Sequence, residues 1–342
     1  GADLITASAG TDNVRIGATA GDSITSGGNF NTLVGTNAGT AITTGDSNVA
    51  VGRNALDAEV AGSLSVAVGV GTLTAQTNST ATDVYNVAVG HGAGNAVTTG
   101  VENTLIGALS GDALTDADEN VAVGYGALSA DTKGGQSVAV GTFALLSQNN
   151  STTTTTYNVA VGDRAGRVIT TGIQNTLLGG VAGDSLTDAD NNVAIGTSAL
   201  GSDTLGSHSV AVGRRALLEQ NFSTATDVYN VAVGSSAGQN VTTGQYNNLI
   251  GGQAGLSLTT GGRNTVNGFG ALGADTLGSR AVAIGFGALD AQNFTTATDN
   301  YNVAVGYDAG GAVTTGTQNT IIGGLAGAAL TTGANNVAVG YE

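Results

Sequence analysis

The chain has 342 residues, of which 25 are acidic and 9 basic, giving a formal net charge of -16. Nucleic acid and anionic membranes are bound by neutralising their charge with Lys and Arg, so this acidic excess argues against both as partners. The chain contains 57 Gly but no Pro, Cys, Met or Trp, which excludes disulfides and thiolate metal sites. No apolar run approaches the length of about 18 residues that a membrane helix needs, so we expect no membrane insertion.

The chain begins with residues 1–12, GADLITASAGTD, which we interpret as a degenerate first coil or cap. Residues 13–342 are predicted to form one continuous repeat domain. A five-residue pattern, best represented by Asn86-Val-Ala-Val-Gly90, returns nineteen times in this range. The copies begin at Asn13, Asn31, Asn48, Ser65, Asn86, Asn103, Asn120, Ser137, Asn158, Asn175, Asn192, Ser209, Asn230, Asn247, Asn264, Ala281, Asn302, Asn319 and Asn336.

The copies are spaced regularly along the chain. From Asn31 onward the steps are 17, 17 and 21 residues, and then 17, 17, 17 and 21 repeatedly, so four units make a super-repeat of 72 residues. Periods this short and this regular are typical of solenoids, in which each repeat forms one coil and stacks on the next.

The fifth position of every copy is Gly, from Gly17 to Gly340. Glycine adopts positive φ without steric cost and lets another backbone approach closely, so it can end a strand in a tight bend. The residues before it, such as Val87-Ala88-Val89, favour a short strand. The sequence therefore predicts an all-β fold, a parallel β-solenoid of about nineteen coils of 17 or 21 residues.

The alternation of side chains along a strand predicts which positions are buried. We expect the second and fourth positions, such as Val87 and Val89, to point into the coil. The eighth position is usually Ala, as at Ala93, and the twelfth is often Val or Leu, as at Leu114. Both are expected to face the same interior from a second strand, so that two strands and two turns complete a flattened coil.

The third position lies on the opposite face of the same strand and is uncharged from Asn31 onward. A strand that is apolar on both faces is usually buried on both, and a long exposed apolar stripe marks an interface. We therefore predict a self-association seam at this position, most simply about a threefold axis. A third wall of the coil, or tolerated surface Ala, are the alternatives. The predicted seam residues are Leu33, Ala88, Leu105, Ala122, Ala160, Leu177, Leu249 and Ile321.

The first position is Asn in fifteen of the nineteen copies. Stacked Asn side chains can hydrogen-bond along a ladder and hold the turn backbone. We interpret this column as structural.

The pattern NVAVGxxA followed by a Gly turn resembles the head repeats of trimeric autotransporter adhesins and the related coils of bacteriophage tail fibres. The resemblance covers the chain from about Asn13, although the coils here are longer than those of the typical adhesin head. It implies a left-handed parallel β-roll wound as a homotrimer. It also implies an extracellular, cell-surface or virion-surface location.

The 21-residue units each carry four extra residues, and insertions in repeat proteins map to one face. Aromatic side chains beside Thr and Asn in these loops could recognise surface glycans, whereas the alternative is that each Tyr packs over its own loop. The candidate recognition residues are Tyr85, Tyr157, Phe222, Tyr229, Phe294 and Tyr301. The same loops and one other segment contain acceptor sequences for N-glycosylation. These candidates are Asn78, Asn150, Asn221, Asn240 and Asn293.

Two acidic segments, GDALTDADEN and GDSLTDADNN, have carboxylates at spacings that could offer oxygens to calcium. Later copies lack these carboxylates, so the fold does not need the metal, and we predict no metal or cofactor as a requirement. The weak calcium candidates are Asp112, Asp116, Asp118, Asp184, Asp188 and Asp190.

Nothing in the sequence predicts catalysis. The two histidines, His91 and His208, occupy different positions of their units and lie far apart in the chain, so they cannot share a metal or a base role. We therefore expect a non-enzymatic structural fibre or adhesin-type rod that associates with itself. The alternative is a ligand-binding solenoid that recognises a glycan, calcium, or ice through Thr pairs such as Thr98-Thr99 and Thr242-Thr243.

Overall fold

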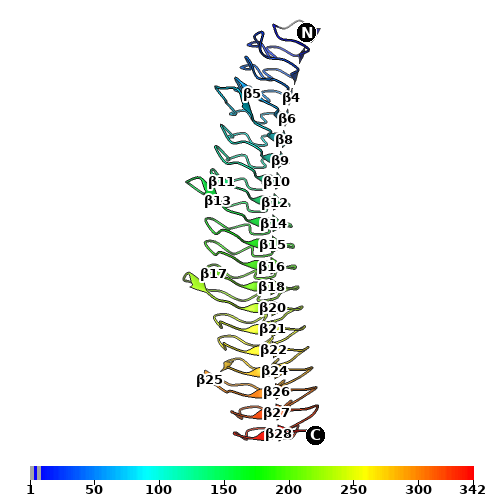
Figure 1. The fold of residues 1–342 in the computed structure, drawn as a ribbon, viewed down its shortest axis with the longest axis vertical. Coiled ribbons are helices and arrows are strands. Elements are labelled where there is room, and N and C mark those ends of the chain that lie inside the picture. Colours follow the sequence, from blue (N-terminus) through cyan, green and yellow to red (C-terminus); the bar gives the residue numbers. More distant parts are fainter. Residues whose placement is uncertain (1–3, 6–8) are drawn as a thin grey trace. The chain divides into compact units, whose positions relative to one another are not determined.

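The structure is a computed structural model that describes residues 4–5 and 9–342. The chain divides into two compact units, residues 1–171 and 172–342. Each unit by itself is a parallel β-solenoid, and the described residues contain strands and turns but no helix (Figure 1). The predicted fold class is confirmed, with nineteen strand copies shared between the units. The single continuous domain predicted for residues 13–342 stays a prediction.

In the first unit one ladder of parallel strands runs through every coil. Equivalent positions lie opposite one another, so that Val87 pairs with Thr104, and Thr104 with Val121. The 17- and 21-residue spacings therefore set the register. The strands of this ladder are β2 (Val14–Ile16), β3 (Thr32–Val34), β4 (Val49–Val51), β6 (Val66–Val68), β8 (Val87–Val89), β9 (Thr104–Ile106), β10 (Val121–Val123), β12 (Val138–Val140) and β14 (Val159–Val161).

The second unit has a ladder of the same kind, in which Ala194 pairs with Ala211 and Ala211 with Ala232. Its strands are β15 (Thr176–Leu178), β16 (Val193–Ile195), β18 (Val210–Val212), β20 (Val231–Val233), β21 (Asn248–Ile250), β22 (Thr265–Asn267), β24 (Val282–Ile284), β26 (Val303–Val305), β27 (Thr320–Ile322) and β28 (Val337–Val339).

The chain starts differently from the coils that follow. Strand β1 (Leu4–Ile5) pairs with β2 in the antiparallel direction, with Leu4 opposite Ile16. The degenerate coil or cap predicted for residues 1–12 falls largely on residues 1–3 and 6–8, which lie outside the described residues.

The glycine at the fifth position ends each strand as predicted. All nineteen have positive φ, between +126° at Gly323 and +150° at Gly268. A Cβ placed on Gly124 would lie 2.5 Å from the carbonyl oxygen of Gly141, the equivalent glycine one coil further on. Because side chains rarely adopt this φ and no room is left for one, glycine is required by both backbone conformation and stacking distance.

The strands face in the direction opposite to the prediction. The third-position side chains, for example those of Ala88 and Leu105, are fully buried inside the coil. By contrast, Val87 is half-buried and Val89 is 36 % exposed. The expectation that the second and fourth positions line the interior is therefore wrong.

The predicted seam is wrong for the same reason, because a side chain inside the coil cannot reach a second copy. All eight predicted seam residues are inaccessible to solvent within their own unit: Leu33, Ala88, Leu105, Ala122, Ala160, Leu177, Leu249 and Ile321.

The asparagine at the first position explains the direction of the strand. Asn120 Nδ2 donates to the carbonyl oxygen of Gly134 (3.0 Å), and Asn120 Oδ1 accepts the backbone N–H of Ser137 (2.9 Å). Its own N–H donates to Asn103 Oδ1 (3.0 Å). The predicted Asn ladder is thereby confirmed. The side chain must point into the coil to reach these groups, and the alternation of the strand then turns the third position inward as well.

The eighth and twelfth positions are buried as predicted, for example Ala93 and Leu114. They do not, however, lie on a second continuous strand, because the segment after each glycine is a series of turns. Short strands occur opposite the ladder only near the 21-residue units. They pair in parallel as β5 (Gly62–Ser63) with β7 (Thr82–Asp83), β11 (Gly134–Gly135) with β13 (Thr154–Thr155), β17 (Gly206–Ser207) with β19 (Thr226–Asp227), and β23 (Gly278–Ser279) with β25 (Thr298–Asp299).

Side-chain size at the third and ninth positions varies between the coils of a super-repeat. A Cβ on Gly94, at the ninth position, would lie 2.7 Å from Leu105 Cδ1 and 2.8 Å from Leu73 Cδ2, so the two leucines fill the space above and below it. The coil of Ala122 carries a buried Leu at the ninth position, Leu128, whereas the coil of Ala88 carries Gly94 there. The core is therefore filled across neighbouring coils.

Candidate functional site

The outer face of the ladder consists of the side chains at the second and fourth positions of the strands. The second position is Val, Thr or Asn, and the fourth is Ile, Val, Leu or Asn, so the face carries no charge in any coil. Fourth-position side chains are between 36 % and 41 % exposed at Val89, Ile106, Val161, Ile195, Val233, Ile250, Ile284 and Ile322. A parallel sheet is normally covered on both faces, and contiguous exposed apolar surface marks an interaction site.

Buried carboxylates hold the long loops, and sequence reasoning missed them. Glu59, Asp131, Asp203 and Asp275 recur every 72 residues at the twelfth position, and all are fully buried. The detectable signal was an acid at a position that is aliphatic in the other 17-residue coils and Gln in the long coils. Burial of a carboxylate is costly unless hydrogen bonds compensate for the lost water, so each of these groups needs several donors.

Asp275 shows how the donors are supplied. Its Oδ1 accepts the backbone N–H groups of Gly278 (3.0 Å) and Phe294 (3.2 Å), and its Oδ2 accepts Gln292 Nε2 (2.6 Å). Gln292 Oε1 in turn accepts Asn302 Nδ2 (2.8 Å), which connects the loop to the Asn ladder. Burial raises the pKa of the Asp275 carboxyl above its usual range, and the three hydrogen bonds limit the rise. The cluster ties the long coil to the coil before it.

The candidate recognition residues of the long loops divide into two groups. Phe222 and Phe294 are only 5 % exposed, so their proposed role in recognition is wrong. The four tyrosines lie at the last position of their coils and are between 48 % and 54 % exposed. They are Tyr85, Tyr157, Tyr229 and Tyr301.

The candidate glycosylation sites also divide by accessibility. Asn78 and Asn150 are buried, and Asn78 Nδ2 donates to Glu59 Oε2 (3.0 Å), so a glycan cannot be attached there without breaking the loop. Asn221 and Asn293 are exposed, and Asn240 is half-buried.

The acidic segments do not assemble into a metal site. Asp112 Oδ1 accepts Ser129 Oγ (2.6 Å), Asp116 lies 3.5 Å from Lys133 Nζ, and Asp118 Oδ1 accepts the N–H of Val101 (2.8 Å). Within the part of the chain that the structure describes, no three His, Cys, Asp or Glu side chains gather to hold a metal ion. The calcium candidates all belong to this part of the chain: Asp112, Asp116, Asp118, Asp184, Asp188 and Asp190.

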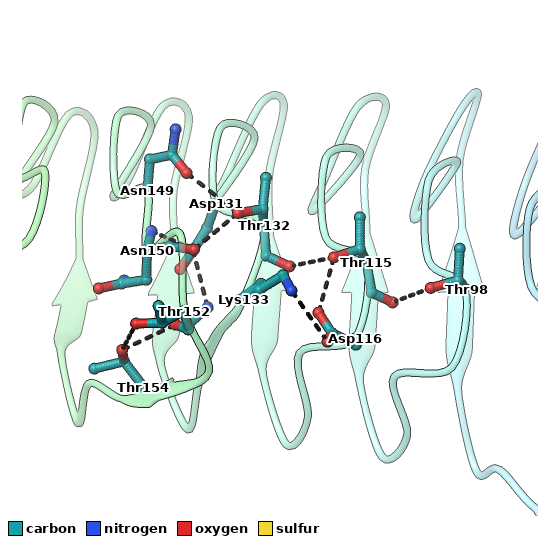
Figure 2. Close-up of polar contacts among 11 residues, drawn as sticks. Thr98, Thr115, Asp116, Asp131, Thr132, Lys133, Asn149, Asn150, Thr152 and Thr154 are labelled. Carbon is teal, nitrogen blue, oxygen red and sulfur yellow. Dashed lines mark hydrogen bonds and ion pairs between the residues drawn. The ribbon is translucent and has the colours of Figure 1, made fainter.

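Threonine hydroxyls form a column that joins successive coils rather than a free array. Thr98 Oγ1 donates to the carbonyl oxygen of Thr115 (3.1 Å), and Thr115 Oγ1 donates to that of Thr132 (2.9 Å) (Figure 2). Thr132 Oγ1 donates to the carbonyl oxygen of Asn150 (2.8 Å). The first Thr of each pair is therefore used within the fold, which argues against a regular ice-binding surface.

Planar side chains form a column at the last position of successive coils in the second unit. The ring centres of His208 and Tyr229 are 5.1 Å apart, and those of Tyr229 and Tyr246 are 5.9 Å apart. Arg263 Cζ lies 5.4 Å from the centre of the Tyr246 ring, within the range of a cation–π contact. A second exposed stack consists of Phe269, Phe286 and Tyr307.

Two cavities open on the surface of this unit. One, of about 260 Å³, lies beside the column and is lined by Thr243, Gln245, Tyr246, Thr260, Gly262, Arg263 and Ser279. The other, of about 360 Å³, includes Asp290. Burial first, and then the neighbouring carboxylate of Asp308, raise the pKa of Asp290.

No family model, no curated protein and no solved structure matches the chain. Among the described residues no helix is long and apolar enough to span a bilayer.

Proposed function

We propose that this chain is a structural, non-enzymatic subunit of a surface fibre, and that copies associate through the outer face of the β-ladder. The single observation that carries the proposal is the uncharged row of half-exposed Val and Ile side chains on that face. The charged side chains of the protein lie outside this row. The resemblance to adhesin heads and phage tail fibres supports a trimer at the surface of a cell or a virion.

The occupant of the outer face is a second copy of the same chain. A different, positively charged partner would be attracted by the acidic net charge of -16, but the outer face offers it no carboxylate. A copy of the same ladder offers an equally uncharged surface with the same repeat of about 4.8 Å between coils, so that side chains can interdigitate in every coil. Because the contact recurs in every coil, many small contributions to the free energy of association add up.

The proposal is tested by placing charge on the outer face. The triple variant Val123→Lys, Val140→Lys and Val161→Lys introduces three like charges at half-exposed positions of adjacent strands. We expect the variant to sediment as a 33.0 kDa monomer under conditions in which the unmodified chain is assembled. The matched control changes Thr142, Thr152 and Asn149 to Lys, outside the ladder, and should leave assembly intact. An assembled triple variant, or a control that dissociates equally, contradicts the proposal.

A further inference from the structure

The cavity beside Arg263 is lined by Gly262, at a position where other super-repeats have an aspartate. From Asn86 onward the four equivalent segments read TDADE at 115–119, TDADN at 187–191, TTGGR at 259–263 and TTGAN at 331–335, and an earlier copy, TTGDS at 43–47, also has Asp at the fourth position. In the first two, the fourth residue is Asp118 or Asp190. In the third, it is Gly262, and the residue after it is Arg263.

The aspartates perform a specific task. Asp118 Oδ1 accepts the backbone N–H of Val101 (2.8 Å), and Asp190 Oδ1 accepts that of Ile173 (2.7 Å). Each carboxylate thus satisfies a donor in the preceding coil. The N–H of Gln245 is the equivalent donor in the third super-repeat, and no described residue accepts a hydrogen bond from it.

The backbone of the third super-repeat keeps the same geometry without the carboxylate. The N–H of Gly262 donates to Ser279 Oγ (3.0 Å), as the N–H of Asp190 donates to Ser207 Oγ (3.0 Å). Gly262 and Gln245 both line the cavity of about 260 Å³, and a Cβ on Gly262 would lie 2.8 Å from the carbonyl oxygen of Gln245. An amide N–H facing such a space favours an acceptor.

The local charge has changed at the same time. The first segment carries Asp116, Asp118 and Glu119, whereas the third carries no acid and one Arg, so the formal charge moves from -3 to +1. Arg263 contacts the Tyr246 ring and lies beside no carboxylate at ion-pair distance among the described residues. The third segment therefore lacks the carboxylate of Asp118 and carries the guanidinium of Arg263. Both differences favour the binding of an external anion at this place.

We propose that this cavity binds the carboxylate group of an acidic sugar. The carboxylate takes the place of the missing Asp side chain, accepts the N–H of Gln245 and pairs with the guanidinium of Arg263. Hydroxyl groups of Thr243, Thr260 and Ser279 line the cavity and suit sugar hydroxyls. The cavity is smaller than the roughly 300–1,000 Å³ of drug-sized sites, so it accepts one sugar residue. The site does not depend on self-association through the outer face.

Calorimetric titration of the full chain with glucuronate, glucose and acetate tests the inference. We expect saturable binding of glucuronate, at least fivefold tighter than acetate and with no detectable binding of glucose. Arg263→Gln should weaken glucuronate binding at least tenfold. The control Arg280→Gln should leave it unchanged, because Arg280 lies in the next coil and pairs with Asp299 (2.9 Å).

Gly262→Asp provides the second test, because it restores the carboxylate found at Asp118 and Asp190. We expect this variant to lose glucuronate binding. If Gly262→Asp fails to fold, the inference is judged on the other two variants: Arg263→Gln should weaken glucuronate binding and Arg280→Gln should not. The inference is overturned if glucuronate does not bind, if acetate binds as tightly, or if Arg263→Gln binds glucuronate as well as the unmodified chain does.

Discussion

Asparagine at the first position sets the direction of the strand in fifteen of the nineteen copies, because its side chain can satisfy two backbone groups only from inside the coil. Asn120 does so with Gly134 and Ser137. A buried amide that loses one such partner leaves an unsatisfied polar group, which costs roughly 1–3 kcal/mol. The polar side chain, and not the larger Val beside it, therefore decides which face is the interior.

A buried carboxylate at the twelfth position should give the second unit a characteristic pH dependence. The folded-state pKa of Asp275 is raised by burial. The folded form therefore holds its proton to higher pH than the unfolded form does, and this group's contribution to stability is fully present below the unfolded pKa. It is lost as pH rises from there through the raised folded pKa.

Urea unfolding between pH 4 and pH 7 measures this effect in Asp275→Asn, which cannot titrate. We expect the gain in unfolding free energy on acidification to be smaller in Asp275→Asn than in the unmodified chain. Asp299→Asn, at an exposed carboxylate, is the control. If the unfolding free energy of Asp275→Asn changes with pH as that of the unmodified chain does, the pKa of Asp275 is not raised by folding, and the prediction is wrong.

At the scale of the strand, two adjacent residues of β9 face opposite ways. Leu105 is fully buried and Ile106 is 40 % exposed. We expect Leu105→Ala to lower the free energy of unfolding by about 2–5 kcal/mol, as in other cores, and Ile106→Ala to lower it by less than about 1 kcal/mol. Denaturant unfolding at a concentration where the chain is dissociated makes the comparison. A larger cost for Ile106→Ala would reverse the assignment of inner and outer faces.

Much of each coil could be predicted from sequence. Spacing gives the register, and the glycine at the fifth position marks the bend, because a solenoid repeats one local conformation. The inner face could not be read from apolarity, since Val87, Ala88 and Val89 are all apolar. The informative contrast was variation: the second position changes from Val87 to Thr104 and Asn248, as outward positions do, whereas the third remains aliphatic from Asn31 onward.

The candidate sites were harder to predict than the coil, because they depend on differences between copies. Phe222 sits in a loop that looks exposed by composition, yet the carboxylate of Asp203 accepts its N–H (3.1 Å) and holds the loop down. The cavity beside Arg263 is visible only when Gly262 is compared with Asp118 and when the donor that Asp118 satisfies is known. Sequence alone shows the substitution but not the N–H that it leaves free.

At the scale of the molecule, the proposed self-association depends on what covers the outer face of the ladders. Each unit buries its Ala and Leu side chains within its own coils and leaves its Val and Ile rows half-exposed. Burying apolar surface is worth about 25 cal/mol per Å², so contacts repeated over many coils add up to a stable interface. In the assembly that we propose, both faces of the sheet are covered.

The molar mass of the unmodified chain, measured by light scattering at micromolar concentration, tests this claim most directly. We predict a mass that is a multiple of 33.0 kDa. The value is three times that mass if the chains meet about a threefold axis. A mass of 33.0 kDa that does not change with concentration would contradict self-association through the outer face.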